Sequence, residues 1–194
     1  MCFEKPETGL LLRPPRDIKK DKLVNWKLLF HAYAVLGVLE SLCAFSMAFW
    51  YLQRAGYPFS KIVFAFGGLP PDLDADDFNE QVARAQSVYF FTLVFMQWGN
   101  LLATRTRRLS IFQHNPFWGP ARNLFVPCAM AASIAFLFFF SYVPFFQKAF
   151  VTRGVPVEYI FIPIAFAVAL LLLDEARKYC VRTWPKGFLA KIAW

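Results

Sequence analysis

Four long and almost uncharged apolar stretches constrain this chain more than any other feature of its sequence. They occupy residues 28–52, 87–104, 124–146 and 157–174. A helix needs about 20 mostly apolar residues to cross the hydrocarbon core of a bilayer, and its backbone polar groups must there be satisfied within the helix itself. The pattern therefore predicts an all-α, polytopic membrane protein with four transmembrane helices.

The composition agrees with a membrane protein and excludes several other classes. Hydrophobic residues make up 58% of the chain and charged residues only 18%, whereas average globular proteins are about 45–50% apolar and about 25% charged. These values exclude a disordered chain, a secreted disulfide scaffold and a typical soluble enzyme. The net charge of +8 lies on Lys and Arg beside the apolar stretches. This placement favours contact with membrane lipids and argues against a nucleic-acid partner.

The distribution of basic residues predicts how the helices are oriented. Residues 1–27, 105–123 and 175–194 carry 16 of the 21 Lys and Arg residues. Cytoplasmic segments of membrane proteins are enriched in Lys and Arg, so we expect a cytoplasmic lead-in, central loop and tail, with both termini on that side. Residues 53–86 and 147–156 carry fewer basic residues and are expected to form extracytoplasmic loops.

The sequence lacks the motifs of the common catalytic machineries. It contains no GxxxxGK[ST], GxGxxG, HExxH or GxSxG pattern, and no phosphorylatable Asp in the context that ion pumps use. The four cysteines form no CxxC pair and no metal-ligand spacing; they are Cys2, Cys43, Cys128 and Cys180. We therefore expect no catalytic residues, no metal site and no cofactor in this chain, and no activity from it alone.

Four polar side chains inside the predicted membrane helices are candidates for a cation site or its supporting groups. Glu40 lies in the first helix, Gln97 and Asn100 in the second, and Ser133 in the third. Polar groups are costly in a membrane and commonly functional, and oxygen-bearing groups from several helices can line a hydrated cation path. Gln97 and Asn100 are three residues apart and share a helix face. Alternatively, these groups only form hydrogen bonds between packed helices.

Two further clusters lie near predicted helix ends. Ser110 follows Arg107 and Arg108, which is a basic-directed kinase pattern. The alternative is an unmodified serine beside cytoplasmic anchoring charges.

At the end of the fourth helix, Asp174 stands three residues before Arg177 and four before Lys178, with Glu175 beside it. This spacing predicts local ion pairs that ease the charges at the membrane interface.

Several segments resemble one membrane-protein family. The segment QWGNLLATRTRRLSIFQ resembles the eighth membrane helix and following loop of Na,K-ATPase-type P-type cation pumps. FEKPETGLLLRPPR and DKLVNWKLLFHAYAVLG resemble the loop before the seventh helix and the entry into that helix. LDEARKYCVRTWPKGFL resembles the end of the tenth helix. Because these matches follow the family's order, the chain is similar to helices seven to ten of such a pump's catalytic subunit.

The resemblance implies a role in ATP-driven cation transport. In the family, the phosphorylation, nucleotide and actuator domains precede this region, so ATP and Mg²⁺ would belong to those domains. The implied partners are the N-terminal remainder of the pump, in the same or a separate chain, and monovalent cations. The implied location is the plasma membrane. The SYGQ-type stretch that contacts the β-subunit in the family is not found between Pro58 and Gln86, which argues against a β partner.

The resemblance also assigns expected roles to single residues. Gln97 matches the family's eighth-helix Gln at the additional sodium site, whereas Asn100 stands where the family has Asp. Ser133 lies near the position of an acidic ninth-helix residue of that site, and Glu40 stands where the family usually has Gln. Ser110 matches the family's kinase-site serine. The alternative to a pump segment is a free-standing four-helix membrane adaptor or regulatory protein.

Overall fold

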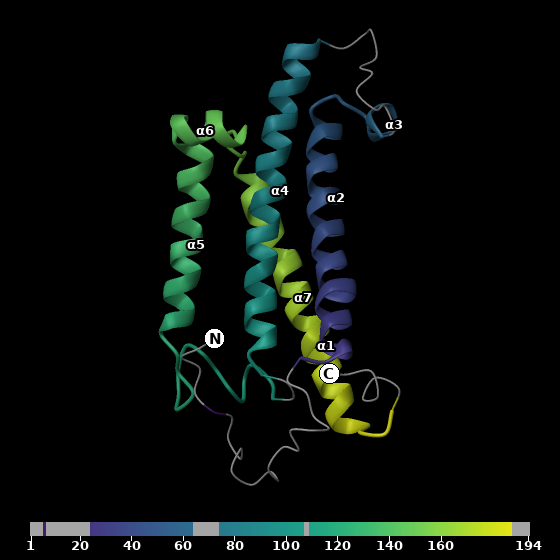
Figure 1. The fold of residues 1–194 in the computed structure, drawn as a ribbon, viewed down its shortest axis with the longest axis vertical. Coiled ribbons are helices and arrows are strands. Elements are labelled where there is room, and N and C mark those ends of the chain that lie inside the picture. Colours follow the sequence, from purple (N-terminus) through teal and green to yellow (C-terminus); the bar gives the residue numbers. More distant parts are fainter. Residues whose placement is uncertain (1–5, 7–23, 64–73, 107–108, 188–194) are drawn as a thin grey trace. The chain divides into compact units, whose positions relative to one another are not determined.

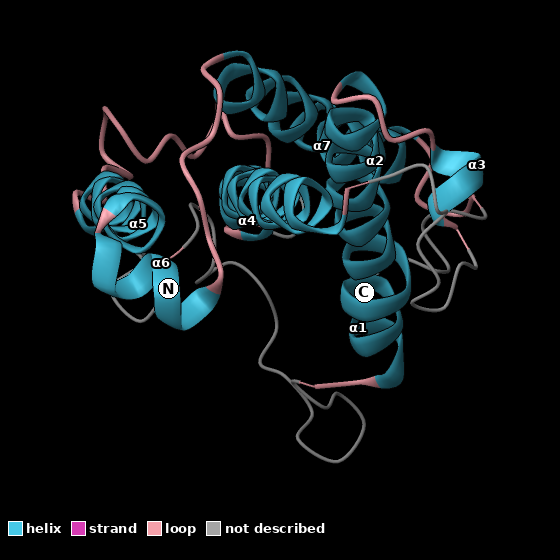
Figure 2. Cartoon of the chain, turned by 90° about the horizontal axis from the view of Figure 1, so that it is seen from above, coloured by secondary structure: helices cyan, strands magenta, loops and turns pink. Residues whose placement is uncertain are grey.

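The computed structural model describes Pro6 and residues 24–63, 74–106 and 109–187. These residues form helices joined by loops, with no strand among them (Figures 1 and 2). The all-α fold class that the sequence predicts is therefore confirmed for this part of the chain.

The first predicted membrane helix is continuous but changes its winding. It consists of α1 (Trp26–Leu29), the π-helical segment η2 (Phe30–Gly37) and α2 (Val38–Arg54). The side chain of Asn25 begins it, because its Oδ1 accepts a hydrogen bond of 2.8 Å from the Leu28 N–H. Such a cap satisfies one of the free amide groups at a helix start.

Helix α4 begins well inside the segment that the sequence predicts to be a loop. After the short α3 (Phe59–Ile62), α4 runs over Ala75–Thr104. The Asp74 side chain accepts a hydrogen bond from the Asp76 N–H at 3.0 Å, and acidic residues in the first turn favour the positive end of the helix dipole. Hydropathy does not detect this start, because the first turns of α4 are polar.

The third predicted helix is divided in two. Helix α5 (Phe125–Tyr142) ends before Val143, and α6 (Pro144–Phe150) begins with the proline. Val143 has an extended backbone, with φ −78° and ψ 123°. A residue that precedes proline is disfavoured in the α conformation, and proline suits the first position of a helix. The break within the predicted range 124–146 follows from this steric restriction.

The last helix, α7 (Glu158–Thr183), continues past Asp174 into the segment predicted to be a tail. Its charged final turns form ion pairs three and four residues apart, which support helical winding in residues that are too polar for the membrane.

Three helical segments are long and apolar enough to cross a membrane: Trp26–Arg54, Phe125–Tyr142 and Glu158–Thr183. Helix α4 is not among them, since amides such as Gln97 and Asn100 lower its mean hydropathy.

The chain divides into two compact units, each built from parts of several helices. Of the described residues, unit 1 contains Pro6 and residues 24–39, 98–106, 109–131 and 167–187. Unit 2 contains 40–63, 74–97 and 132–166. The interior of unit 2 includes the fully buried Phe91, whose ring meets that of Phe138 edge to face at 5.5 Å.

A glycine allows α4 and α7 to pack very closely in unit 1. A Cβ atom at Gly99 would lie 2.5 Å from the carbonyl oxygen of Ala167 and 3.1 Å from its carbonyl carbon. These are backbone atoms, which cannot rotate away as a side chain can. Small residues that let two backbones approach are a common basis of helix packing in membranes.

We predict that Gly99→Ala destabilises the purified chain by about 1–3 kcal/mol, as overpacking generally does. The measurement is the thermal unfolding midpoint in detergent. Gly37→Ala is the matched control, because the nearest atom to its added Cβ is the Ala32 carbonyl oxygen at 3.4 Å. An unchanged midpoint for Gly99→Ala would show that the two helices are not in such close contact.

Candidate functional site

Three of the four candidate cation-site residues belong to unit 2, and their side chains differ in exposure. Glu40 on α2 is buried, with 9% of its surface exposed. Ser133 on α5 is half-buried, and Gln97 on α4 is exposed. The interior position of Glu40 fits a group that is shielded from lipid, whereas Gln97 presents its amide at the surface of the described residues.

Asn100, the fourth candidate, belongs to unit 1. Its side-chain Oδ1 is buried and accepts no hydrogen bond within the described part of the chain, while its backbone oxygen accepts one from the Thr104 hydroxyl at 2.8 Å. An unsatisfied buried acceptor costs about 1–3 kcal/mol. The Asn100 oxygen is therefore positioned to accept a hydrogen bond or bind a cation.

The charges at the end of α7 form a buried ionic cluster in unit 1. Both predicted pairs are present: Asp174 Oδ1 lies 2.8 Å from Arg177 Nη2, and Asp174 Oδ2 lies 2.9 Å from Lys178 Nζ. Glu175 Oε1 lies 3.4 Å from the same ammonium group. Because the Lys178 side chain is fully buried, its charge depends on these oxygens in place of water.

This cluster also connects α7 to two other segments of unit 1. Lys178 Nζ donates a hydrogen bond of 2.8 Å to the carbonyl oxygen of Ala103, in the last turn of α4. Carbonyl groups in that turn have no partner within their own helix. Glu175 Oε1 accepts a hydrogen bond of 3.1 Å from the Ile111 N–H, in the following loop. The spacing of the charges predicts the local pairs but gives no signal for these two long-range contacts.

The loop that contains Ser110 is held by its own hydrogen bonds. Ser110 is buried, with 9% of its surface exposed, and its hydroxyl accepts a hydrogen bond of 3.3 Å from the Phe112 N–H. Arg105 donates one of 3.2 Å to the carbonyl oxygen of His114. Arg107 and Arg108, the other members of the predicted kinase pattern, lie outside the described residues. A kinase would reach the Ser110 hydroxyl only after this loop had opened.

A polar network in unit 2 fixes the connection between α6 and α7. The Arg153 N–H donates a hydrogen bond of 2.7 Å to the Ser87 hydroxyl, and its guanidinium lies 2.9 Å from Glu80 Oε2. The Thr152 hydroxyl donates one of 2.9 Å to the Phe140 carbonyl. Sequence reasoning missed this network, because its members are far apart in the chain and form no motif.

A second contact of unit 2 joins the turn after α2 to the start of α4. The Tyr57 hydroxyl donates a hydrogen bond of 2.5 Å to Asp77 Oδ2, and Gln81 Nε2 donates one of 3.4 Å to Asp77 Oδ1. The hydrogen bond to Asp77 raises the pKa of Tyr57 to about 12. The hydrogen bonds from Tyr57 and then Gln81 hold the pKa of Asp77 below its ordinary value.

Comparisons with known proteins agree on one family. The family model "Cation transporting ATPase, C-terminus" matches residues 1–180. The sodium/potassium-transporting ATPase subunit alpha-A of Artemia franciscana is 28% identical, with 98% of this chain and 20% of that protein covered. The corresponding alpha subunit of Drosophila melanogaster is 26% identical, with 97% and 19% covered. Alpha-2 of Rattus norvegicus is 26% identical, with 98% and 19% covered. The chain therefore spans about a fifth of the length of these relatives.

We predict that Lys178→Met destabilises the chain by about 3–5 kcal/mol, because it leaves the carboxylates of Asp174 and Glu175 without their buried cation. The measurement is the free energy of unfolding in a denaturant titration. Lys186→Met, which removes an exposed cation, serves as the control and should leave stability nearly unchanged. Equal effects of the two substitutions would contradict the structural role of Lys178.

We predict that the Tyr57–Asp77 contact stabilises the chain only between two pH limits. The Asp77 contribution is present above its unfolded pKa and is lost as pH falls through its lowered folded pKa. The Tyr57 contribution is present below its unfolded pKa of 10.0 and is lost as pH rises through about 12. An ultraviolet titration of tyrosine ionisation should show one group near 12 that disappears in Tyr57→Phe and persists in Tyr179→Phe. Its persistence in Tyr57→Phe would refute this assignment.

Proposed function

Because the chain belongs to the family of cation-transporting ATPase C-terminal domains, we propose that it forms the C-terminal membrane part of a P-type cation pump of the Na/K-exchanging type. The observation that carries this proposal is the family match over residues 1–180, together with alpha-subunit relatives that cover 97–98% of the chain. The chain supports the ion-binding helices, while the remainder of the pump performs ATP hydrolysis.

The proposed topology has four membrane spans, with both termini in the cytoplasm and the pump in the plasma membrane. Three helical segments qualify as candidate spans by their length and apolar composition. Helix α4 is proposed as the fourth, because its 30 residues give a length of about 45 Å at 1.5 Å per residue, enough to cross the roughly 30 Å hydrocarbon core. The concentration of Lys and Arg in residues 1–27, 105–123 and 175–194 supports the orientation.

The proposed partners are the remainder of the pump and monovalent cations. ATP and Mg²⁺ would bind to that remainder, because the sequence of this chain has no nucleotide-binding motif. A β-subunit is not part of the proposal, since the stretch between Pro58 and Gln86 lacks the SYGQ-type segment. Ser110 stays a proposed phosphorylation site that requires opening of its loop.

Blue-native electrophoresis of the native membranes, followed by an ATPase assay of each band, tests the proposal. We expect the chain in a complex the size of a complete pump, with ATP hydrolysis stimulated by Na⁺ and K⁺. The control is the chain expressed alone, which should hydrolyse no ATP. A small complex without ATPase activity would instead support a free-standing adaptor.

We predict that Glu40→Gln in the complete pump changes the apparent cation affinity by about threefold or more. A change of this size needs only a small difference in binding free energy, since a tenfold change in affinity corresponds to about 1.4 kcal/mol. A buried carboxylate on a cation path loses its charge in this variant, while the shape of the side chain is kept. Assembly should remain intact on native gels. The control is Asp76→Asn, which neutralises an exposed carboxylate at the start of α4. If affinity is unchanged, Glu40 has a packing role only.

A further inference from the structure

The ends of two candidate membrane spans meet at an exposed ion pair in unit 2. Arg54 is the last residue of α2 and Glu158 is the first residue of α7, and both helices belong to candidate spans. Nη1 of Arg54 lies 2.9 Å from Oε2 of Glu158. A helix that crosses the hydrocarbon core of a bilayer ends among the lipid headgroups. The two charges therefore stand at headgroup level.

Aromatic rings adjoin this ion pair. Cζ of Arg54 lies over the ring of Trp50, 5.7 Å from its centroid. The Trp50 and Tyr159 rings meet edge to face with centroids 5.5 Å apart, and Tyr159 is buried. Aromatic faces attract cations, and Trp and Tyr are enriched where a membrane meets water. Trp50, Arg54, Glu158 and Tyr159 thus form one cluster, the ion-pair cluster, which combines a cation, an anion and aromatic rings.

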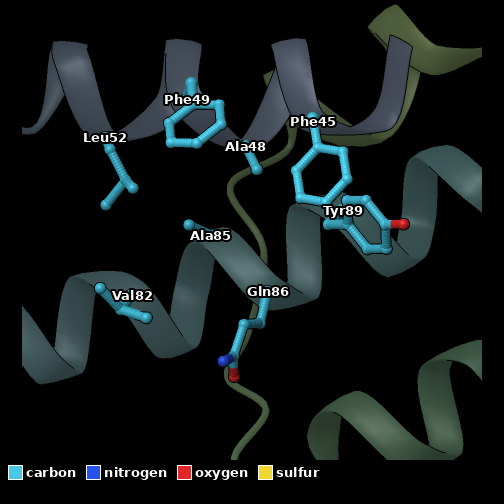
Figure 3. Close-up of a pocket in the computed structure, with 8 residues that line it drawn as sticks. All are labelled: Phe45, Ala48, Phe49, Leu52, Val82, Ala85, Gln86 and Tyr89. Atoms are coloured by element: carbon cyan, nitrogen blue, oxygen red, sulfur yellow. The ribbon is translucent and has the colours of Figure 1, made fainter. Parts of the chain in front are cut away.

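The ion-pair cluster lies on the side of α2 that faces away from α4. Figure 3 shows Phe45, Ala48 and Leu52 extending from α2 toward α4, where they line a cavity of about 340 Å³. Successive residues of an α-helix are turned by about 100°, so Trp50 and Arg54 point in roughly the opposite direction. Helix α4 therefore does not cover the surface that carries the ion pair.

Both charged side chains are accessible to a further partner. The side chains of Arg54 and Glu158 are 53% and 64% exposed, and Trp50 is 40% exposed. An exposed ion pair contributes little to stability, so holding the helices together does not require these charges. The pair uses Nη1 of Arg54, whereas a guanidinium carries five N–H donors and a carboxylate accepts several hydrogen bonds. Each group can bind another charge while it stays beside its neighbour.

The charges of a zwitterionic lipid headgroup complement the ion-pair cluster. The headgroup of a choline phospholipid joins a phosphate to a quaternary ammonium group by a short linker. A guanidinium binds phosphate oxygens through paired N–H groups. Quaternary ammonium groups bind to aromatic faces, and the carboxylate of Glu158 adds the opposite charge. An anionic headgroup has no cation to place beside Glu158, so the cluster favours a choline phospholipid.

Apolar surface for the acyl chains continues along α7 from the ion pair. Phe161 and Ala165 follow Glu158 by three and seven residues, which places all three on one face of the helix. Both Phe161 and Ala165 are exposed. A lipid whose headgroup contacts Arg54 and Glu158 can therefore lay its chains against this face.

We propose that Trp50, Arg54 and Glu158 bind the headgroup of a choline phospholipid in the extracytoplasmic leaflet. Arg54 binds the phosphate, while Glu158 and the ring of Trp50 bind the quaternary ammonium group. The buried Tyr159 packs against Trp50 and fixes the position of its ring. The side of the membrane follows from the proposed topology, whereas lipid binding itself goes beyond the proposed pump function.

Native mass spectrometry of the detergent-purified native complex, titrated with phosphatidylcholine, tests this site. We expect one retained phosphatidylcholine whose apparent affinity falls by about threefold or more in Arg54→Gln, Glu158→Gln and Trp50→Leu. Trp50→Phe keeps an aromatic face and should bind more tightly than Trp50→Leu. The matched controls are three exposed residues that lie outside the cluster, and their substitutions should leave the affinity unchanged: Lys61→Gln, Asp76→Asn and Trp26→Leu.

Phosphatidylglycerol, which has the phosphate but no ammonium group, serves as the second probe. Its affinity should fall in Arg54→Gln and should not fall in Glu158→Gln, because that carboxylate has no cation of this lipid to bind. Equal losses of both lipids in Glu158→Gln would show that the ion pair only positions the two helices, and would overturn the assignment of the ammonium group.

Unchanged phosphatidylcholine binding in Arg54→Gln and Trp50→Leu would overturn the site. Cross-linking of Glu158→Cys to another polypeptide of the native complex would assign the surface to a protein partner and overturn it as well. Lipid retention is measured without ATP hydrolysis. A native complex that lacks cation-stimulated ATPase activity would therefore refute the pump function and leave the lipid site standing, and loss of the lipid site would leave the pump function standing.

Discussion

A buried ammonium group holds the end of α4, the last helix and the loop between α4 and α5 together in unit 1. Lys178 Nζ replaces water at the carbonyl of Ala103, where the helical hydrogen-bond pattern of α4 ends. Its charge is balanced by Asp174 and Glu175, and Glu175 in turn binds the backbone of Ile111. Each partner satisfies a group that would otherwise be buried without one. The position of the loop therefore depends on a side chain more than 60 residues away in the sequence.

The sequence predicts those parts of the fold that depend on local physical chemistry. Apolar stretches predict the helices, and charge spacing predicts the pairs of Asp174 with Arg177 and Lys178. The start of α4 at Ala75 was not predictable from hydropathy, because its first turns are held by Asp74 and by helix-favouring polar residues. Contacts such as Arg153 with Glu80 depend on the packing of distant segments, which no local pattern encodes.

In the candidate site, too, local sequence identifies the polar residues, whereas their burial depends on how distant segments pack. Glu40, Gln97 and Asn100 are conspicuous in sequence because polar groups are rare in apolar stretches, and the structure adds that Glu40 is buried while Gln97 is exposed.

The close approach of Gly99 to Ala167 has a mechanical consequence. The final turns of α4 are attached to α7 at two places, by backbone contact at Gly99 and by the Lys178 bond to Ala103. A single contact would let the two helices rotate about it, whereas two separate contacts oppose both sliding and rotation of one helix against the other. Residues 98–104 and the part of α7 from Ala167 to Lys178 are therefore held together as one rigid body.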